Sequence, residues 1–212
     1  MINQPKLNLA CGQIRIDGFF GIDIIQTDAV DAIMDLQSFP WGIASDSAEE
    51  IICNHYVEHT PMDTLGAVLV KLLSMSFDFN HFQKLVRAYD EMEIPNDGLI
   101  QFMEEIWRIL KPGGRIRLEC PYYNNESAWQ DPTHRRAITE STFAYFNKQW
   151  RINSNLIHYP ITTDFAIQVE GYGLYPDMTE KSTEEKKFSC RHLNNFIAYI
   201  RFTLTKPLTL TK

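Results

Sequence analysis

The sequence predicts an α/β protein built on a mostly parallel, Rossmann-type sheet. The apolar run at residues 6–10 ends in small residues, which continue through Cys11 and Gly12. The next run, at residues 20–24, contains the acid Asp23 near its end. In such sheets small residues let a ligand approach the backbone, and the acid after the second strand accepts hydrogen bonds from the ribose hydroxyls. These features predict an adenosine-containing ligand at the carboxyl edge of the sheet.

The same stretch differs from a dinucleotide site. Its pattern, Ala10-x-Gly12-x-x-Arg15, lacks a third glycine, and only eight residues separate Gly12 from Gly21. That connection is too short for a full helix that presents its N-terminus to a pyrophosphate. No Lys-Ser or Lys-Thr follows, so the stretch is not a P-loop. S-adenosylmethionine (SAM), a nucleoside without phosphates, fits this pattern.

Strand and helix patterns then alternate along the chain. Further strands are predicted at residues 30–36 and 50–54, and near-continuous apolar runs favour strands covered on both faces. Two apolar stripes with helical spacing follow at residues 63–76 and 82–89, and another begins at Leu99 after an Asn-Asp-Gly break that offers a helix cap. Pro112 and two glycines end this helix.

The last third of the chain predicts fewer regular elements. A fifth strand is expected at residues 115–120 and a short helix around 139–146. Two late strands, at about 164–172 and 195–205, are joined by the charged segment 177–187, which we interpret as a solvated loop. At 212 residues the chain is expected to form a single domain, residues 1–212.

Composition limits the classes of partner and compartment. The net charge of −7 disfavours sequence-independent nucleic-acid binding, which relies on Lys and Arg to neutralise phosphates. The four cysteines are widely spaced with no CxxC pair, which is typical of a reduced, intracellular protein, here expected to be cytoplasmic. A strand that begins by Lys6 leaves no room for a signal peptide, and no apolar run is long enough to span a membrane.

Six segments, taken together and in their order along the chain, resemble the class I SAM-dependent methyltransferases. The most specific is the helix-to-strand corner at residues 104–114, which ends in Lys-Pro-Gly-Gly. The others are residues 8–12, 18–23, 35–40, 51–59 and 131–135. The resemblance covers roughly residues 6–146. It implies a seven-stranded, mostly parallel sheet with an antiparallel last strand, helices on both faces, and a helical insertion at about residues 61–95 after the fourth strand.

The resemblance also implies which residues contact SAM. Asp23 would hold the ribose, and Asp35 would meet the adenine amino group. The full set of expected cofactor contacts is Asn8, Ala10, Cys11, Gly12, Asp23, Ile24, Asp35, Leu36, Asn54 and His59. Ala10 departs from the family pattern, because it replaces a glycine where the ligand packs closely. The insertion is either a lid over the acceptor or a packing surface for a partner chain.

Two residues are candidates for catalysis. His134 carries an imidazole, a group suited to taking a proton from an acceptor hydroxyl or amine. Its Asp-Pro-Thr-His segment also fits a rigid turn that bonds its own backbone. Tyr122, with Tyr123 and Trp129, either lines an acceptor pocket or covers the sheet edge. Pro121-Tyr122-Tyr123 is only a weak match to the Asn-Pro-Pro-Tyr signature of amino-methylating nucleic-acid enzymes.

No metal is implied by the resemblance. The run from His55 to His59 has the H-x-x-E-H spacing of some zinc proteases, but that chemistry needs both histidines on one helix face and a distant third ligand. Because the run leaves a buried strand, we expect Glu58 and His59 to line the ligand cleft or to fix the loop by hydrogen bonds.

These observations predict a SAM-dependent methyltransferase that acts on an unidentified acceptor, more plausibly a small molecule than bulk nucleic acid. Two alternatives remain open. One is a non-catalytic SAM-binding module that acts through a partner, and the other is a nucleotide-dependent oxidoreductase, which the missing third glycine disfavours. The oligomeric state is not predicted.

Overall fold

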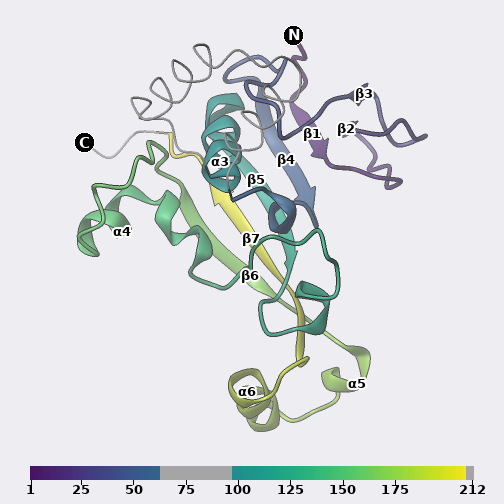
Figure 1. The fold of residues 1–212 in the computed structure, drawn as a ribbon, viewed down its shortest axis with the longest axis vertical. Helices are drawn as coiled ribbons and strands as arrows, with labels where there is room; N and C mark the ends of the chain where they lie inside the picture. Colours follow the sequence, from purple (N-terminus) through teal and green to yellow (C-terminus); the bar gives the residue numbers. More distant parts are fainter. Residues whose placement is uncertain (63–96, 209–212) are drawn as a thin grey trace, which may run out of the picture.

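The computed structural model describes residues 1–62 and 97–208. Its centre is a seven-stranded sheet in the order β3-β2-β1-β4-β5-β7-β6 (Figure 1). The first five strands pair in parallel, while β7 is antiparallel to both β5 and β6. The strands are β1 (Lys6–Leu9), β2 (Phe20–Asp23), β3 (Ala32–Ile33), β4 (Ala48–Asn54), β5 (Leu110–Pro121), β6 (Ala166–Leu174) and β7 (Ile197–Thr205). The predicted seven-stranded α/β sheet with an antiparallel last strand is confirmed.

Helices and short 3-10 turns connect the later strands. Helix α3 begins at the Asp97 cap, whose carboxylate accepts hydrogen bonds from the N–H groups of Leu99 and Ile100, as the sequence predicts. The described helical elements are η1 (Val57–His59), α3 (Gly98–Ile109), η2 (Glu126–Ala128), η3 (Thr142–Phe146), α4 (Lys148–Asn153), α5 (Pro176–Thr179) and α6 (Thr183–His192).

One face of the sheet carries the hydrophobic core. Leu9, Cys53, Leu118 and Phe202 follow one another across four paired strands, and all are buried. Helix α3 packs over this row, and Phe143 of η3 meets Phe202 edge-on, with ring centroids 4.8 Å apart. The core therefore lies between the sheet and the helices on this single side.

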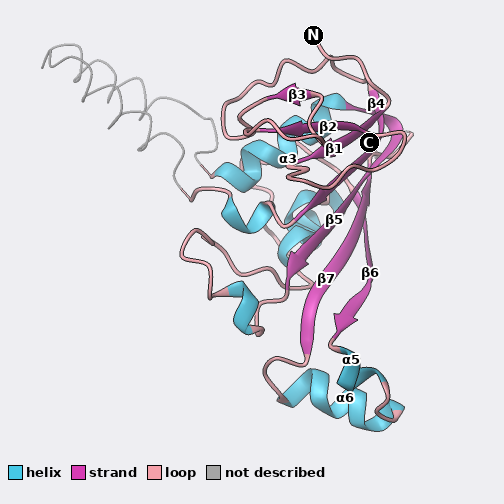
Figure 2. Ribbon diagram, turned by 90° about the vertical axis from the view of Figure 1, so that its right-hand side faces the viewer, coloured by secondary structure: helices cyan, strands magenta, loops and turns pink. Residues whose placement is uncertain are grey.

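The opposite face of the sheet is polar. Glu50 on β4 forms ion pairs with Arg115 and Arg117 on β5, and Glu119 pairs with Arg201 on β7 at 2.7 Å. Figure 2 shows the described helices on one side of the sheet, with α5 and α6 beyond the ends of β6 and β7. The sequence predicted helices on both faces of the sheet, but within residues 1–62 and 97–208 they cover one face. The reason is that the connections between β1, β2 and β3 are too short to hold a helix.

Two further predictions concern the segments 177–187 and 61–95. The segment 177–187 was expected to be a loop, and this was wrong, because α5 and α6 occupy most of it. Ser182 starts α6 with a capping box in which its hydroxyl and the Glu185 carboxylate each bond the other's backbone N–H. The helical insertion at 61–95 lies almost wholly outside the described residues.

Among residues 1–62 and 97–208, no helix is both long enough and apolar enough to cross a bilayer.

Gly21 in β2 packs tightly against the loop that follows this strand, and a substitution at Gly21 tests this packing. A Cβ at this position would overlap the carbonyl oxygen of Ala29 and lie 3.1 Å from the sulfur of Cys11. We expect Gly21→Ala to lower the free energy of unfolding by about 1–3 kcal/mol, as overpacking does in cores. Urea-induced unfolding measures the change.

The matched control is Gly42→Ala, where the nearest atom to a new Cβ is Met34 Cε at 3.9 Å. This variant should stay within about 0.5 kcal/mol of the parent protein. Equal stability of the two variants would contradict the predicted overlap.

Candidate functional site

A cavity of about 270 Å³ opens at the carboxyl ends of β1, β2 and β4. Ligands of open α/β sheets bind at this edge. Five of the predicted cofactor residues line the cavity, namely Ala10, Asp23, Ile24, Asp35 and Leu36. Met34, Gln37, His55 and Tyr56 complete its wall. Residues from four separate segments therefore converge on one place, as the sequence predicts.

Asp23 joins the loop after β1 to the end of β2. Its Oδ2 accepts a hydrogen bond of 2.8 Å from the Gly12 N–H, and its Oδ1 accepts one of 2.7 Å from the Ile24 N–H. The Thr27 hydroxyl donates to the Gly12 carbonyl oxygen, which ties the same two loops together again. Because an ionised carboxylate has about four acceptor positions, Asp23 can support this loop and still accept from a ligand.

Asp35 lies on the other side of the cavity. Its carboxylate accepts from the Gln37 N–H at 2.9 Å and from the Ser38 hydroxyl at 2.8 Å, so its orientation is fixed. The hydroxyl of Tyr56 is buried and has no hydrogen-bond partner among the described residues. Burial raises the pKa of this phenol, with smaller contributions from Cys53 and Asp35. Tyr56 therefore keeps its proton, and the residue forms part of the cavity wall.

The backbone after β1 adopts left-handed angles. Ala10 has a φ of 52° and Gly12 a φ of 55°. A side-chain-bearing residue reaches this region at a cost of about 1–2 kcal/mol, while glycine reaches it freely. Open space surrounds Gly12, where an added Cβ would meet nothing within 4 Å. The turn after β1 therefore places Gly12, in its left-handed conformation, where a ligand can approach the backbone.

The other predicted cofactor residues near β1 have structural roles. The Asn8 side chain donates to the Ile14 carbonyl oxygen, and the buried Cys11 thiol donates to the Ala29 carbonyl oxygen. Burial raises the pKa of Cys11, with Asp23 contributing next. Neither residue lines the cavity. Asn54 is exposed at the end of β4 and does not line it either.

A bidentate ion pair supports the connection from β1 to β2. Arg15 donates to both oxygens of Asp31 at 2.9 and 2.7 Å, and Asp31 Oδ2 also accepts from the Gly21 N–H at 2.7 Å. These bonds hold the connection in the absence of a helix in residues 10–19. The Gly21 N–H first, and Arg15 second, keep the pKa of Asp31 below its usual value.

His59 and His134, which are not part of the cavity wall, contact each other. Their rings are perpendicular, with centroids 4.6 Å apart. His59 Nδ1 lies 2.9 Å from the Thr133 hydroxyl, which itself donates to Asp131. The Thr133 N–H also donates to Asp131, so the expected rigid turn is present. Bonds from Thr133 keep the pKa of Asp131 below its usual value, so this carboxylate stays ionised.

Glu58 lies next to these histidines. Its side chain is almost fully buried, and neither carboxylate oxygen accepts a hydrogen bond from a described residue. His55 Nδ1 is 3.5 Å from Glu58 Oε1, and His55 Nε2 is 3.3 Å from Glu119. Glu58 first, against the opposing effect of burial, raises the pKa of His55.

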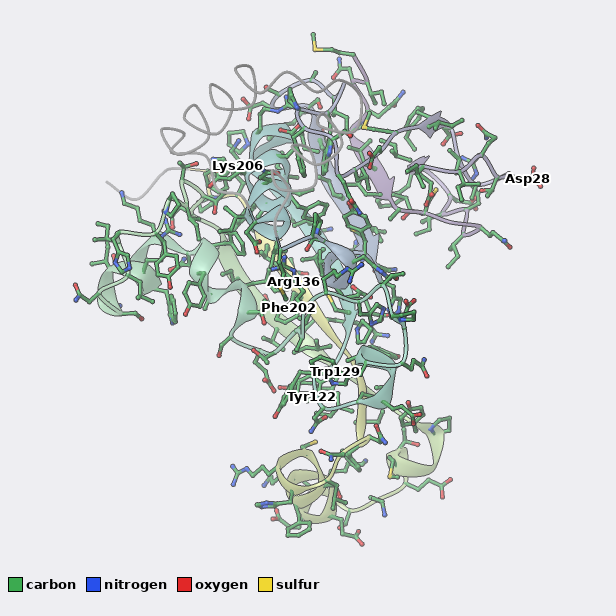
Figure 3. The ribbon with its side chains drawn as sticks, viewed as in Figure 1. Asp28, Tyr122, Trp129, Arg136, Phe202 and Lys206 are labelled. Carbon is green, nitrogen blue, oxygen red and sulfur yellow. The ribbon has the colours of Figure 1, made fainter. Side chains whose placement is uncertain are left out.

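The aromatic residues after β5 lie outside the cavity wall. Tyr122 is buried, and its hydroxyl donates to Glu140 at 2.6 Å. Burial first, and this carboxylate next, raise the pKa of Tyr122. Figure 3 shows Tyr122 and Trp129 in the region near the end of β5, and the Trp129 indole donates to the Tyr123 carbonyl oxygen. The hydrogen bond to Glu140 gives Tyr122 a structural role. The catalytic role predicted for Tyr122 stays a prediction.

Comparison with solved structures identifies the fold. A SAM-dependent methyltransferase from Archaeoglobus fulgidus aligns with 96% of this chain and 86% of its own, at 13% identity and a TM-score of 0.56. This chain has a methyltransferase fold. A putative methyltransferase from Bacillus halodurans C-125 is 12% identical over 98% of this chain and 94% of its own, with a TM-score of 0.44. A SAM-dependent methyltransferase from Mesorhizobium loti is 11% identical over 96% and 91%, with a TM-score of 0.43. No protein-family model and no curated protein matches the sequence.

Within this methyltransferase fold, the sequence prediction missed several wall residues. Tyr56 and His55 follow β4 directly, and the left-handed φ of 53° at His55 turns the chain at the edge of the cavity. Their place after a predicted strand was a usable signal. Nothing in the sequence indicated the contact between His59 and His134, because the two residues lie far apart along the chain.

The hydrogen bonds of the Asp31 carboxylate predict a pH effect on stability. Because the folded pKa of Asp31 is below its ordinary value of 3.8, the bonds it accepts, first from the Gly21 N–H and then from Arg15, contribute stability above that pH. The contribution is lost as the pH falls through the folded pKa. Asp31→Asn should therefore show a smaller loss of stability than the parent protein between about pH 5 and pH 2.

Urea midpoints measured across this range test the prediction. The control is Asp17→Asn, which changes an exposed carboxylate in the same connection. A loss of stability in acid that is identical in Asp31→Asn and the parent protein would contradict the assigned role of Asp31.

Proposed function

We propose that this protein is a SAM-dependent methyltransferase. The observation that carries the proposal is the convergence of two carboxylates, Asp23 and Asp35, on one cavity at the carboxyl edge of a methyltransferase fold. Asp23 would accept from the ribose hydroxyls, and Asp35 from the adenine amino group. This assignment follows the sequence prediction and adds the cavity that joins the two residues.

The other wall residues fit a nucleoside. Ile24 lines the cavity and is 60% exposed, so a planar base packed against it would remove apolar surface from water. Gly12 is not part of the cavity wall, but it leaves open space in which a ligand can approach the loop after β1. These features support SAM over a ligand held mainly through phosphates, for which the described cavity wall offers no lysine or arginine.

When bound, SAM supplies a methyl group that is already activated by its sulfonium centre. The protein therefore has to orient the donor, hold the acceptor in line and exclude water, and such positioning alone accounts for large rate gains. The rigid loops held by Asp23 and by the ion pair of Arg15 with Asp31 serve the first of these tasks.

The acceptor is proposed to be a small molecule. The net charge of −7 disfavours a long phosphate backbone as the substrate. His59 follows Tyr56 of the cavity wall by three residues and contacts His134, and the two imidazoles would supply polar groups to the acceptor. Proton removal by His134 remains a prediction. A non-catalytic SAM-binding module would share the cavity, and transfer of a labelled methyl group to any acceptor would distinguish the enzyme from it.

The two carboxylates give the decisive binding test. Asp23→Ala should weaken the binding of S-adenosylhomocysteine by about 1.5–3 kcal/mol, because a hydrogen bond to a charged group is lost. Asp35→Ala should weaken it in the same direction. Isothermal titration calorimetry measures both affinities, and thermal unfolding verifies that each variant is folded.

The control is Asp28→Ala, at the outer end of the loop between β2 and β3 (Figure 3). Its affinity should match that of the parent protein. If the folded parent protein binds neither SAM nor S-adenosylhomocysteine at millimolar concentration, the proposed function is wrong. Unchanged binding in both Asp23→Ala and Asp35→Ala would remove these residues from the site.

A further inference from the structure

We propose that Glu58, His59 and His134 form a binding site for a divalent transition-metal ion. Glu58 and His59 belong to η1, just after β4, and His134 belongs to the loop after β5. One ligand atom from each residue lies within 4.8 Å of the other two. The cavity wall at His55 and Tyr56 directly precedes this group along the chain.

The hydrogen bonds of the two histidines leave one nitrogen of each free for a metal. His134 Nδ1 lies 3.0 Å from the Ala128 carbonyl oxygen, which can only accept, so Nδ1 carries the proton. The Thr133 hydroxyl donates to Asp131, so it accepts from His59 Nδ1. Nε2 of each ring then carries no proton, and His134 Nε2 lies 4.0 Å from Asp131 Oδ2. Metal-binding histidines typically donate their other N–H to a carbonyl or to a group held by a carboxylate.

Glu58 provides the independent observation. Its carboxylate is 1% exposed, yet neither oxygen accepts a hydrogen bond from a described residue. A buried charge is costly unless it is paired or coordinates a metal. His55 approaches one oxygen at 3.5 Å, while Glu119, on the other side of His55, is paired with Arg201. A cation held by His59 and His134 would pair directly with the buried carboxylate of Glu58.

The backbone holds the three residues together without a ligand. The Arg135 N–H donates to the Glu58 carbonyl oxygen at 2.7 Å, which joins the loop after β5 to η1. The Arg136 guanidinium donates to the carbonyl oxygens of Thr60 and Pro61, each at 3.1 Å. Both links flank the proposed ligands, so the site is largely formed before an ion binds.

The ligand set indicates the class of metal. Two imidazoles and one carboxylate suit Zn²⁺, Co²⁺ or Fe²⁺, whereas Mg²⁺ and Ca²⁺ prefer oxygen ligands alone. In a tetrahedral site with bonds of about 2.0–2.2 Å, the ligand atoms lie about 3.3 Å apart, so binding draws the three residues slightly closer. Three protein ligands leave a coordination position open.

This assignment competes with the role of His134 as a general base, because both roles use the Nε2 lone pair. The buried Glu58 carboxylate favours metal binding, because neither of its oxygens accepts a hydrogen bond from a described residue. Metal binding is measured directly, so the test does not depend on the proposed methyl transfer.

The test titrates Co²⁺ into the full-length protein after treatment with EDTA, followed by visible absorption. We expect one Co²⁺ per chain, displaced by Zn²⁺ and not by equimolar Mg²⁺. Glu58→Gln and His134→Ala should each weaken binding by about 100-fold. Thr133→Val, which removes only the hydroxyl that orients His59, should weaken it by about tenfold.

The matched control is His158→Ala, which removes an exposed histidine next to Tyr159. It should bind Co²⁺ as the parent protein does. Circular dichroism verifies folding, and if His134→Ala does not fold, the nearly isosteric Glu58→Gln carries the test. The proposal is overturned if the folded parent protein binds neither Co²⁺ nor Zn²⁺. It is also overturned if Glu58→Gln weakens binding less than tenfold, or if His158→Ala weakens it equally.

Discussion

The position of β1 between β2 and β4 is the constraint on which the rest of the structure depends. Leu9 pairs with Ile22 on one side and with Cys53 on the other. Because all three strands run in the same direction, they end at nearly the same level. The residues that follow them, Ala10, Asp23 and the segment from Asn54, must therefore emerge side by side. The cavity is a consequence of this register.

The short loops at this edge are held by polar contacts rather than by helix packing. Asp23 bonds the Gly12 N–H, and Asp31 bonds both Arg15 and the Gly21 N–H. In each case a carboxylate replaces the support that a longer connection would obtain from a buried helix. The left-handed Ala10 is tolerated within this network. The result is a rigid edge built from very few residues.

Much of the fold follows from local patterns in the sequence. Strand periodicity placed the strands of the sheet within a few residues. The exception is β3, which includes only Ala32 and Ile33 of the predicted run 30–36. The Asp97 cap and the Pro-Gly-Gly stop indicated where α3 begins and ends. The helix α6 was missed because its charged sequence has no apolar stripe, and the capping box at Ser182 was the overlooked signal.

The candidate site was predictable only where a residue follows a strand directly. Asp23, Asp35 and Ala10 were found in this way, and all three line the cavity. Asn8 and Cys11 were expected in the site because the family resemblance implies them, but their side chains bond backbone carbonyl oxygens. The group of Glu58, His59 and His134 depends on a loop from a different strand, and no local pattern reports that approach.

The polar face of the sheet also specifies how the strands align. Along β5, Arg115, Arg117 and Glu119 alternate with the buried Ile116, Leu118 and Cys120. A slip of one residue would exchange the two sets, so that three charged groups entered the core and three apolar side chains met water. The ion pairs of this face are individually weak, since surface pairs contribute about 0–1 kcal/mol each. Their larger effect is to exclude alternative pairings of β5, and so to protect the alignment of the edge that carries the cavity.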